Sequence, residues 1–434
     1  MKICVVGMGF VGLTLAVAAA GKGHDVIGID TKKEVLDSLR DCSAHFFEKG
    51  LQEQLSDVFE RGKLKIAENL EVSIDSDYYL ITVGTPLDFE KKPNFSAIKL
   101  ATEQIAKVMK DGAVIILRST VQLGTTRNIV SPILDASGKK YSLAYCPERT
   151  IEGDALNELS LLPQICSGID SLSLEKSVNF FDTITNIIVS VSSLEVAELV
   201  KLLDNSFRDY SFAFANEVAE ICDAVSLDCN EVIASANYKY SRTNIPKPGL
   251  VGGPCLEKDP YILLESCKKN NYIPKLIHSA RVLNEEVIER ALENFLRNAK
   301  NLDSEIFTIT VCGMAFKGRP ETDDLRGSPA KIIIDYLKRK YKFATIRVQD
   351  FACDNKALSL EYQLSAVDMD TALADSDIII IANNHPNYGL ISDSMQGSDY
   401  SRLKYIYDFW SIVKRELVAD NHNLSLIQFG NGRI

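Results

Sequence analysis

The sequence predicts an α/β protein in which two doubly wound, parallel-sheet domains are joined by a long central helix. Short β-branched apolar runs alternate with helix-forming stretches through residues 1–190, and the same alternation returns in residues 299–434. Between them, residues 191–298 begin with a long amphipathic helical pattern. A chain of 434 residues is about three times the length of a typical domain. We therefore expect these three ranges to be its domains.

The first expected element is a strand that leads into a glycine-rich turn. Lys2–Val6 is a short β-branched run of the kind found in buried strands, and the apolar stretch Leu13–Ala20 is helix-forming. Between them, Gly7 permits a tight turn, Gly9 lets the backbone approach a pyrophosphate, and Gly12 allows close packing of helix and strand. The first N–H groups of the helix would then face the phosphates. This spacing predicts a dinucleotide-binding turn.

The second expected strand supports the same interpretation. Asp25–Ile29 is again rich in apolar residues, and Asp30 follows it directly. A carboxylate at this point can accept hydrogen bonds from the adenosine ribose and repel a 2′-phosphate, so we expect NAD rather than NADP. For the glycines alone, a purely structural turn is the alternative.

Further elements complete the first domain. Strands are expected at Tyr78–Val83, Ala113–Leu117 and Tyr141–Tyr145, with a helix at Phe95–Met109. Ligands of a parallel sheet lie beyond the carboxyl ends of its strands. Polar or turn-forming segments stand at these places in the sequence: residues 83–86, 118–120 and 146–149.

The amphipathic helix that follows is expected from Ser193 to about Ala224, because its apolar residues recur at helical spacing. Lys201 and Asn205 are four residues apart and therefore share one face of it. A lysine on a solvated face and an asparagine tolerated within a helix are the ordinary interpretation. A catalytic pair is the alternative.

A loop rich in glycine and proline, residues 241–259, follows a second expected helix at Cys229–Tyr238. Cys255 lies in this loop, just before a helix that we expect to begin near Lys258. A thiol close to a helix N-terminus is acidified, which makes it a candidate nucleophile. Burial as a small apolar side chain is the alternative, and the residues alone do not favour either.

The last part of the chain repeats the order of strand, turn and helix. Strands are expected at Ile306–Cys312, Thr345–Val348 and Ser376–Ala382, and a helix at Pro329–Lys338. Gly313 is the one glycine where the first domain has three, so we predict a second Rossmann-like domain that lacks the dinucleotide fingerprint. Two cations flank an acidic segment of this domain and could neutralise a diphosphate: Lys317 and Arg326.

Composition excludes several classes of protein. The net charge of −11 argues against a general nucleic-acid binder, and no apolar run approaches the roughly 18 to 20 residues that span a bilayer. Ten cysteines are scattered without the spacing of metal ligands, so no metal site is expected. Reduced thiols in a cytoplasmic protein are the expected state.

Together these motifs resemble the UDP-glucose/GDP-mannose dehydrogenase family along nearly the whole chain. Several separate segments occur in the family's order, which is far more specific than any one of them. Besides the first glycine turn with Asp30, these segments are Arg118–Val121, Pro147–Arg149, Glu198–Asn205, Gly252–Asp259 and Phe316–Pro329. The family implies two Rossmann-like domains joined by a long central helix that also forms a dimer.

The resemblance also implies a reaction, in which a sugar C6 alcohol is oxidised to a carboxylate in two steps with two NAD molecules. Cys255 would attack the intermediate aldehyde to form a thiohemiacetal and then a thioester, which water hydrolyses. Lys201 and Asn205 match the residues that stabilise the developing oxyanion. Three further residues match those that transfer protons or place water: Asp259, Glu148 and Thr120.

Binding residues are carried over in the same way. The matched NAD-binding positions are Gly7, Gly9, Phe10, Val11, Gly12, Asp30, Thr85, Thr120 and Lys258. The matched UDP-sugar positions are Glu148, Arg149, Lys201, Asn205, Arg242, Gly252, Lys317 and Arg326. We expect a UDP-sugar substrate and a homodimer or higher oligomer, with no nucleic-acid or membrane partner.

Two departures from the glucose-type pattern narrow the choice of substrate. Glu257 stands where those members usually have proline, and Arg149 follows Glu148 where they have Phe-Leu. The segments Asn205–Glu217 and Arg242–Ile245 resemble the branch that acts on UDP-N-acetylhexosamines. We therefore expect a UDP-N-acetylhexosamine 6-dehydrogenase, with UDP-glucose 6-dehydrogenase as the alternative. A non-catalytic nucleotide-sugar sensor and a two-electron alcohol dehydrogenase are alternatives from other classes.

Overall fold

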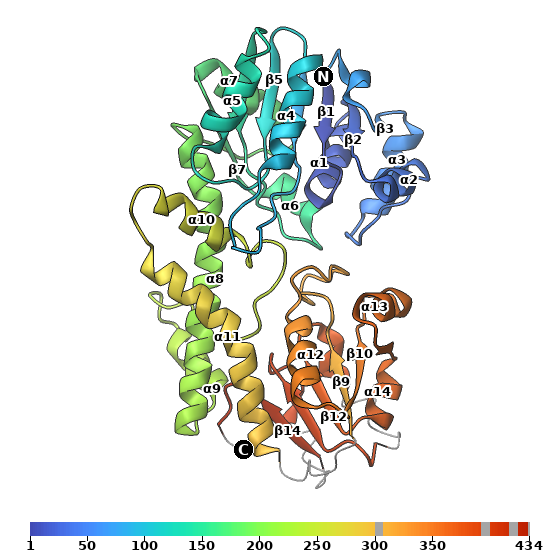
Figure 1. Ribbon diagram of the computed structural model, residues 1–434, viewed down its shortest axis with the longest axis vertical. Coiled ribbons are helices and arrows are strands. Elements are labelled where there is room, and N and C mark those ends of the chain that lie inside the picture. Colours follow the sequence, from blue (N-terminus) through green and yellow to red (C-terminus); the bar gives the residue numbers. More distant parts are fainter. Residues whose placement is uncertain (300–306, 392–399, 416–423, 433–434) are drawn as a thin grey trace. The chain divides into compact units, whose positions relative to one another are not determined.

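The computed structural model confirms an α/β protein with two sheet-containing units (Figure 1). It describes four stretches of chain: residues 1–299, 307–391, 400–415 and 424–432. The first compact unit consists of Met1–Asn205 and Tyr261–Ile273. The second consists of Ser206–Pro260 and Pro274–Ile434.

The first unit contains an eight-stranded sheet in the order β3-β2-β1-β4-β5-β6-β7-β8. Its strands are β1 (Lys2–Val6), β2 (Asp25–Ile29), β3 (Leu64–Ala67), β4 (Tyr78–Ile81), β5 (Ala113–Leu117), β6 (Tyr141–Tyr145), β7 (Gln164–Gly168) and β8 (Ile188–Ser190). Among the predicted strands, β1, β2, β5 and β6 have the expected ends, whereas β4 stops at Ile81 instead of Val83. Because β1 pairs with both β2 and β4, the strand order reverses beside β1, which is where such sheets bind ligands.

One strand departs from the predicted parallel arrangement. β7 runs antiparallel to β6, with Ala144 opposite Gly168. The side-chain amide of Gln164, the first residue of β7, donates to Pro147 O at 3.1 Å. The chain therefore turns back at the edge where β6 ends, without the crossover that a parallel neighbour requires.

Helices cover both faces of this sheet, as predicted. They are α1 (Phe10–Gly21), α2 (Lys33–Arg40), α3 (Leu51–Glu60), α4 (Ser96–Val108), α5 (Ser131–Asp135), α6 (Ala155–Leu161) and α7 (Ser171–Phe181), with short turns η1 (Leu70–Ser73) and η2 (Thr126–Val130). Ile3 and Val5 of β1 share a buried cluster with α1, α3 and α7, whereas Cys4 and Val6 share another with α4 and α5. Alternate residues of β1 thus pack into two different cores, one on each face of the sheet. This explains why its residues from Ile3 to Val6 are all apolar.

The predicted central helix is α8 (Leu194–Val225), which matches its expected ends to within one residue (Figure 1). The first segment of the first unit ends within α8, at Asn205. Three helices follow: α9 (Cys229–Asn237), α10 (Asp259–Lys268) and α11 (Lys275–Asn298). Among the described residues, no helix combines the length and the apolar character needed to cross a membrane.

The second unit contains a six-stranded parallel sheet in the order β11-β10-β9-β12-β13-β14. Its strands are β9 (Thr308–Cys312), β10 (Thr345–Gln349), β11 (Ser365–Ala366), β12 (Ile378–Ile381), β13 (Tyr405–Asp408) and β14 (Ser425–Gln428). Its helices are α12 (Pro329–Lys340), α13 (Asn355–Tyr362) and α14 (Met369–Asp375), with a turn η3 (Pro386–Leu390). Ile306, expected to open β9, lies outside the described residues.

The two sheets share a local feature besides their strand order. Gly7 follows β1 with φ +97°, and Gly313 follows β9 with φ +88°. In each case the N–H of the next residue donates to an aspartate at the end of the neighbouring strand, Asp30 at 2.7 Å and Asp350 at 2.6 Å. The second sheet is therefore a structural repeat of the first, as the sequence predicts.

Candidate active site

The turn after β1 has the geometry of an anion-binding helix N-terminus. A Cβ on Gly12 would lie 1.8 Å from the carbonyl oxygen of Gly7, so only glycine fits this packing contact. A Cβ on Gly9 would meet nothing within 4 Å, and Gly9 caps α1 without a side-chain hydrogen bond. Phe10 and Val11 open the helix, so their N–H groups lack intrahelical partners and can bind phosphate.

Asp30 lies beside this turn. Its carboxylate accepts from Met8 N at 2.7 Å and from Lys32 N at 2.9 Å. His45, which the sequence did not single out, interacts electrostatically with Asp30, although burial dominates and lowers the pKa of His45. The buried Nδ1 of His45 has no hydrogen-bond partner among the described residues, and its ring packs edge-on against Phe46. This polar atom beside Asp30 is a further candidate for binding the cofactor.

Hydrogen bonds from side chains connect the segments that follow β4 and β5. Thr85 Oγ1 donates to Thr120 O at 2.8 Å, and Ser119 Oγ donates to Val83 O at 2.6 Å. The structure therefore brings the segments 83–86 and 118–120 together, as their positions after neighbouring strands predict.

A buried ion pair between Arg118 and Glu148 lies at the same edge. Arg118 also donates to Cys146 O at 3.2 Å, and the backbone N–H groups of the two residues after Glu148 donate to its Oε1 at 2.7 and 2.9 Å. Burial acts to raise the pKa of Glu148, but the Arg118 charge and these hydrogen bonds hold that pKa below its ordinary value. Glu148 is therefore ionised at neutral pH and accepts hydrogen bonds there without donating any.

Lys201 and Asn205 lie on α8, and both are buried, as a catalytic pair requires. Lys201 is 8% exposed, and its ammonium has no hydrogen bond or ion pair within the described part of the chain. Glu198, one turn earlier, accepts from the N–H groups of Gly124 (2.5 Å) and Thr126 (2.9 Å). Glu198 therefore fixes this turn of α8 to the loop after β5. A buried ammonium without a protein partner is suited to bind an anionic oxygen.

The two arginines that the sequence links with the sugar have partners in the protein. Arg149 Nε donates to Asp204 Oδ2 at 2.8 Å, next to Asn205 on α8. Arg242 Nε donates to the hydroxyl of Tyr240 at 2.9 Å, and the guanidinium lies 4.6 Å from the centre of that ring.

Cys255 belongs to the second unit, where it is exposed in a turn before α10. Two glycines let this turn pack closely on the segment between β9 and α12. A Cβ on Gly252 would lie 2.5 Å from the ring of Pro329, and one on Gly253, where φ is +94°, would lie 2.5 Å from the ring of Phe316. The glycines before the thiol are therefore required by packing.

Hydrogen bonds and charges hold the rest of the turn. The buried guanidinium of Arg281 donates to Leu256 O at 2.9 Å. Lys258 Nζ lies 2.7 Å from a carboxylate oxygen of the fully buried Asp259. Burial acts to lower the pKa of Lys258, but the charges of Asp259 and Cys255 raise it above its ordinary value. Lys258 is therefore a charged ammonium that interacts with the Cys255 sulfur.

The predicted diphosphate-binding cations lie in the segment on which this turn packs. Lys317 Nζ is 5.3 Å from the centre of the Phe316 ring. The side chain of Arg326 is 65% exposed and donates from Nε to both carboxylate oxygens of Asp324 at 2.9 Å. The acidic segment thus orients Arg326, as the sequence suggests. Gly327 accepts from Gly253 N at 2.9 Å, so the second unit brings this segment and the cysteine turn together.

Sequence reasoning assigned no role to three residues that position others, although two of them lie in segments that carry the family resemblance. Arg118 supports Glu148, Glu198 supports the Lys201 turn, and Arg281 supports the cysteine turn. Each contacts a group at least 25 residues away along the chain. The spacing of residues along the chain does not reveal such partners. A charged residue close in sequence to a predicted site residue, as Arg118 is to Thr120, is nevertheless a usable signal.

Comparison with known families matches most of the chain, in three parts. Family models of UDP-glucose/GDP-mannose dehydrogenases match residues 1–182 (NAD binding domain), 195–286 (central domain) and 310–415 (UDP binding domain). The UDP-N-acetyl-D-mannosamine dehydrogenase of Pyrococcus horikoshii is 32% identical over 427 residues, which cover 96% of this chain and 97% of the relative.

Solved structures agree with this match. The structure of the UDP-D-ManNAc dehydrogenase from Pyrococcus horikoshii has a TM-score of 0.88 and 29% identity, covering 100% of both chains. A UDP-glucose dehydrogenase from the archaeon Pyrobaculum islandicum has a TM-score of 0.86 and 25% identity, covering 99% of this chain and 97% of the other.

Proposed function

Because this chain belongs to the UDP-glucose/GDP-mannose dehydrogenase family and is an NAD-dependent nucleotide-sugar dehydrogenase, we propose that it oxidises C6 of a UDP-N-acetylhexosamine to the carboxylate. UDP-N-acetyl-D-mannosamine is the substrate we favour, since the related Pyrococcus horikoshii enzyme carries that name. The observation that carries the four-electron chemistry is the exposed Cys255 thiol beside the charged Lys258.

Cys255 is the proposed nucleophile. Its sulfur adds to the C6 aldehyde left by the first oxidation, and the carbonyl oxygen becomes the hydroxyl of a thiohemiacetal. The second oxidation converts this hydroxyl carbon into a thioester. Water then adds to the thioester carbonyl, the carbon–sulfur bond breaks, and the products are the carboxylate and the free thiol. A positive charge such as that of Lys258 stabilises the thiolate that attacks and later leaves.

Lys201 and Asn205 are proposed to stabilise the negative charge that develops on the C6 oxygen. A buried ammonium and a buried amide can each donate a hydrogen bond to an oxyanion, and low solvent exposure strengthens both interactions. The absence of a protein partner for Lys201 in the described chain supports this role.

Glu148, Thr120 and Asp259 are proposed to handle water and protons. Glu148 is ionised and therefore accepts a proton of the attacking water, while the hydroxyl of Thr120 helps to place that water. Asp259 is joined to Lys258 next to Cys255, which supports a role in proton transfer at the sulfur.

NAD is the cofactor of this family, and the first unit has a turn that fits it. We propose that the start of α1, with Gly9, Phe10 and Val11, holds the pyrophosphate, and that Asp30 accepts from the adenosine ribose. Thr85, Thr120 and Lys258 remain proposed cofactor contacts. When bound, NAD supplies the hydride acceptor for both oxidations.

The sugar nucleotide is proposed to bind through its diphosphate and through its sugar. Lys317 and Arg326, beside the Gly252 turn, neutralise the UDP diphosphate. Arg149 and Arg242 are proposed to act near the acetamido group. The bond of Arg149 to Asp204, next to Asn205, supports this place for it.

We further propose that the chain forms a homodimer through α8. Six large apolar side chains of this helix are exposed at positions that recur every seven or four residues: Val196, Leu203, Phe207, Phe214, Ile221 and Val225. This spacing places them along one stripe, which is the pattern of a helix that packs against a partner helix. The three-part division at residues 1–190, 191–298 and 299–434 also remains a proposal, supported by the three family matches.

Initial rates of NAD reduction with a panel of sugar nucleotides test the substrate. We expect kcat/KM to be about 5- to 150-fold higher for UDP-N-acetylmannosamine than for UDP-glucose, because a polar partner of the acetamido group would be left without its hydrogen bond when glucose binds. UDP-N-acetylglucosamine and UDP-N-acetylgalactosamine complete the panel. Arg242→Ala should reduce the preference, whereas Arg40→Ala on α2 serves as the matched control. If UDP-glucose is the best substrate, the proposed branch is wrong.

A further inference from the structure

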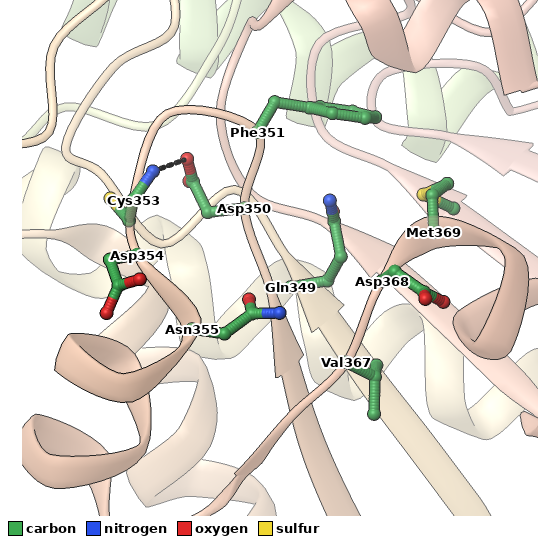
Figure 2. Close-up of a pocket in the computed structure, with 9 residues that line it drawn as sticks. All are labelled: Gln349, Asp350, Phe351, Cys353, Asp354, Asn355, Val367, Asp368 and Met369. Carbon is green, nitrogen blue, oxygen red and sulfur yellow. Dashed lines mark hydrogen bonds between the residues drawn. The ribbon is translucent and has the colours of Figure 1, made fainter.

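A cavity of 370 Å³ lies in the second unit at the carboxyl end of β10, apart from every residue assigned above to cofactor or substrate (Figure 2). It is lined by Gln349, Asp350, Phe351, Cys353, Asp354, Asn355, Val367, Asp368 and Met369. These residues come from the end of β10, the start of α13, and the segment between β11 and α14.

Gln349 contributes a polar side chain that faces this cavity. The residue is 2% exposed, and its Oε1 accepts from the hydroxyl of Tyr388 at 2.9 Å. Its Nε2 has no hydrogen-bond partner among the described residues, and in Figure 2 this nitrogen points into the space between Phe351 and Met369. An amide N–H group that no described protein group accepts can donate to an acceptor of a ligand at this point.

Phe351 and Met369 supply apolar surface on either side. The ring of Phe351 is 37% exposed, and it stacks on the imidazole of His385 with 5.1 Å between ring centres. That contact holds the ring in place, and Figure 2 shows it edge-on above the Gln349 amide. A rigid aromatic side chain opposite a thioether suits a flat heteroaromatic ring.

The charged residues around the cavity limit which substituents the ring of a ligand can have. Asp350 is already satisfied, since its carboxylate accepts from four backbone N–H groups at 2.6 to 3.2 Å. Asp354 and Asp368 cap α13 and α14 through Oδ1 and are otherwise exposed at the rim, where a carboxylate can accept further hydrogen bonds. No lysine or arginine lines the cavity. Hydroxyl or amino groups therefore fit here, and phosphate groups do not.

Because the second sheet repeats the structure of the first, the cavity has an equivalent position in the first unit. Asp350 stands at the end of β10 as Asp30 stands at the end of β2, and in the first unit that position is assigned to the adenosine half of the cofactor. In the second unit α12 begins at Pro329, sixteen residues after Gly313, so no helix N-terminus follows the glycine turn to bind phosphates. The counterpart thus keeps room for a base and ribose but lacks the pyrophosphate site.

We propose that this cavity binds a nucleoside, with the base against Phe351, an acceptor of the base on Gln349 Nε2, and the ribose hydroxyls at Asp354 and Asp368. The site takes a nucleoside in preference to a nucleotide because its rim is acidic. It is separate from the residues proposed for the reaction.

Calorimetric titration of the full chain in saturating NAD and UDP tests the site, because these two ligands then occupy the proposed cofactor and sugar-nucleotide sites. Adenosine and uridine are the probes, and we expect at least one of them to bind saturably at one site per chain. The corresponding 5′-monophosphate should bind at least 10-fold more weakly. Absence of saturable heat with both nucleosides, or tighter binding of the monophosphate, would overturn the proposal.

Variants identify the residues involved. Gln349→Met and Phe351→Ala should each weaken nucleoside binding at least 10-fold, while Tyr388→Phe, which removes only the internal bond to Gln349, should change it less than about 3-fold. Unchanged affinity in both site variants would contradict the assignment. Photo-crosslinking of the unaltered chain by 8-azidoadenosine avoids any doubt about folding. The adduct should map to residues 349–369, and labelling confined to other segments would refute the site.

Discussion

At the scale of single residues, the ten cysteines differ most in their exposure. Cys255 is exposed, whereas the other nine are buried or half-buried. Burial raises the pKa of several of these thiols, for example Cys4 and Cys229 to about 12 each. Neutral thiols are poor nucleophiles, so these surroundings favour the exposed Cys255 as the proposed nucleophile.

Cys255→Ser should abolish steady-state formation of the uronic acid while leaving the melting temperature within about 2 °C, because an exposed side chain contributes little to packing. A serine hydroxyl is a weaker nucleophile near neutral pH, and its ester would be a slower acyl donor. Product formation and thermal melting are the two measurements. Cys267→Ser, in α10, is the matched control and should keep its activity; a fully active Cys255→Ser variant would make Cys255 structural.

Glu148 and Arg118 predict a pH dependence of stability. The pKa of Glu148 is lowered in the folded chain, so its stabilising effect is complete above the ordinary value of 4.5 and is lost as pH falls through the lowered value. Glu148→Gln leaves the buried Arg118 charge without its partner, which should cost about 3–5 kcal/mol of unfolding free energy at pH 7.

Urea denaturation of both chains from pH 7 to pH 3 measures this effect. The difference in unfolding free energy between the two chains should shrink as pH falls from 4.5 through the lowered value, because the unfolded carboxylate binds a proton before the native one does. A difference that stays constant over this range would show that Glu148 is not the titrating group.

At the scale of elements, the two glycines at opposite ends of α1 make a matched pair. Gly12→Ala would place a methyl group 1.8 Å from the Gly7 carbonyl oxygen, so we expect a loss of about 1–3 kcal/mol or more and loss of NAD binding. Gly21→Ala meets nothing within 4 Å and should be neutral or stabilising by up to about 1 kcal/mol. Chemical denaturation and NAD titration measure both, and equal effects of the two changes would contradict the packing role of Gly12.

The elements that sequence reasoning found are those with a complete local signal. β1, β2, β5 and β6 are mostly buried runs in which apolar residues predominate, so their ends could be predicted. β8 and β11 are short strands of three and two residues at sheet edges, and their pairing depends on neighbours that no short window contains. The reversed direction of β7 is likewise a tertiary feature, because its pairing with β6 is accompanied by the long-range bond between Gln164 and Pro147.

The candidate site likewise contains features that the sequence predicted and features that it did not. Glycine turns, the Lys201 and Asn205 spacing, and the cysteine loop are local patterns, and the structure gives each a geometry that suits its proposed role. The Arg118 pair with Glu148 and the Glu198 bonds to the loop after β5 join residues at least 30 positions apart. These contacts form only once the sheet has assembled, so the sequence did not indicate them.

At the scale of the whole molecule, the apolar stripe of α8 predicts the oligomeric state. Phe207→Ser combined with Phe214→Ser should convert the proposed homodimer into a monomer, because the change removes two large apolar side chains from the contact. Light scattering after size-exclusion chromatography measures the mass. Leu172→Ser on α7, which also replaces an exposed apolar side chain by serine, should leave the dimer intact. A monomeric unaltered chain, or a dimer that survives the double change, would contradict the use of this stripe.

The central claim is that a single enzyme oxidises one sugar carbon twice through a thioester on Cys255. The amount of NADH formed per UDP-N-acetylmannosamine consumed, measured at completion together with the mass of the product, tests this claim most directly. We predict two NADH per sugar and a product that carries a C6 carboxylate. One NADH per sugar, with an aldehyde or ketone as the product, would contradict it.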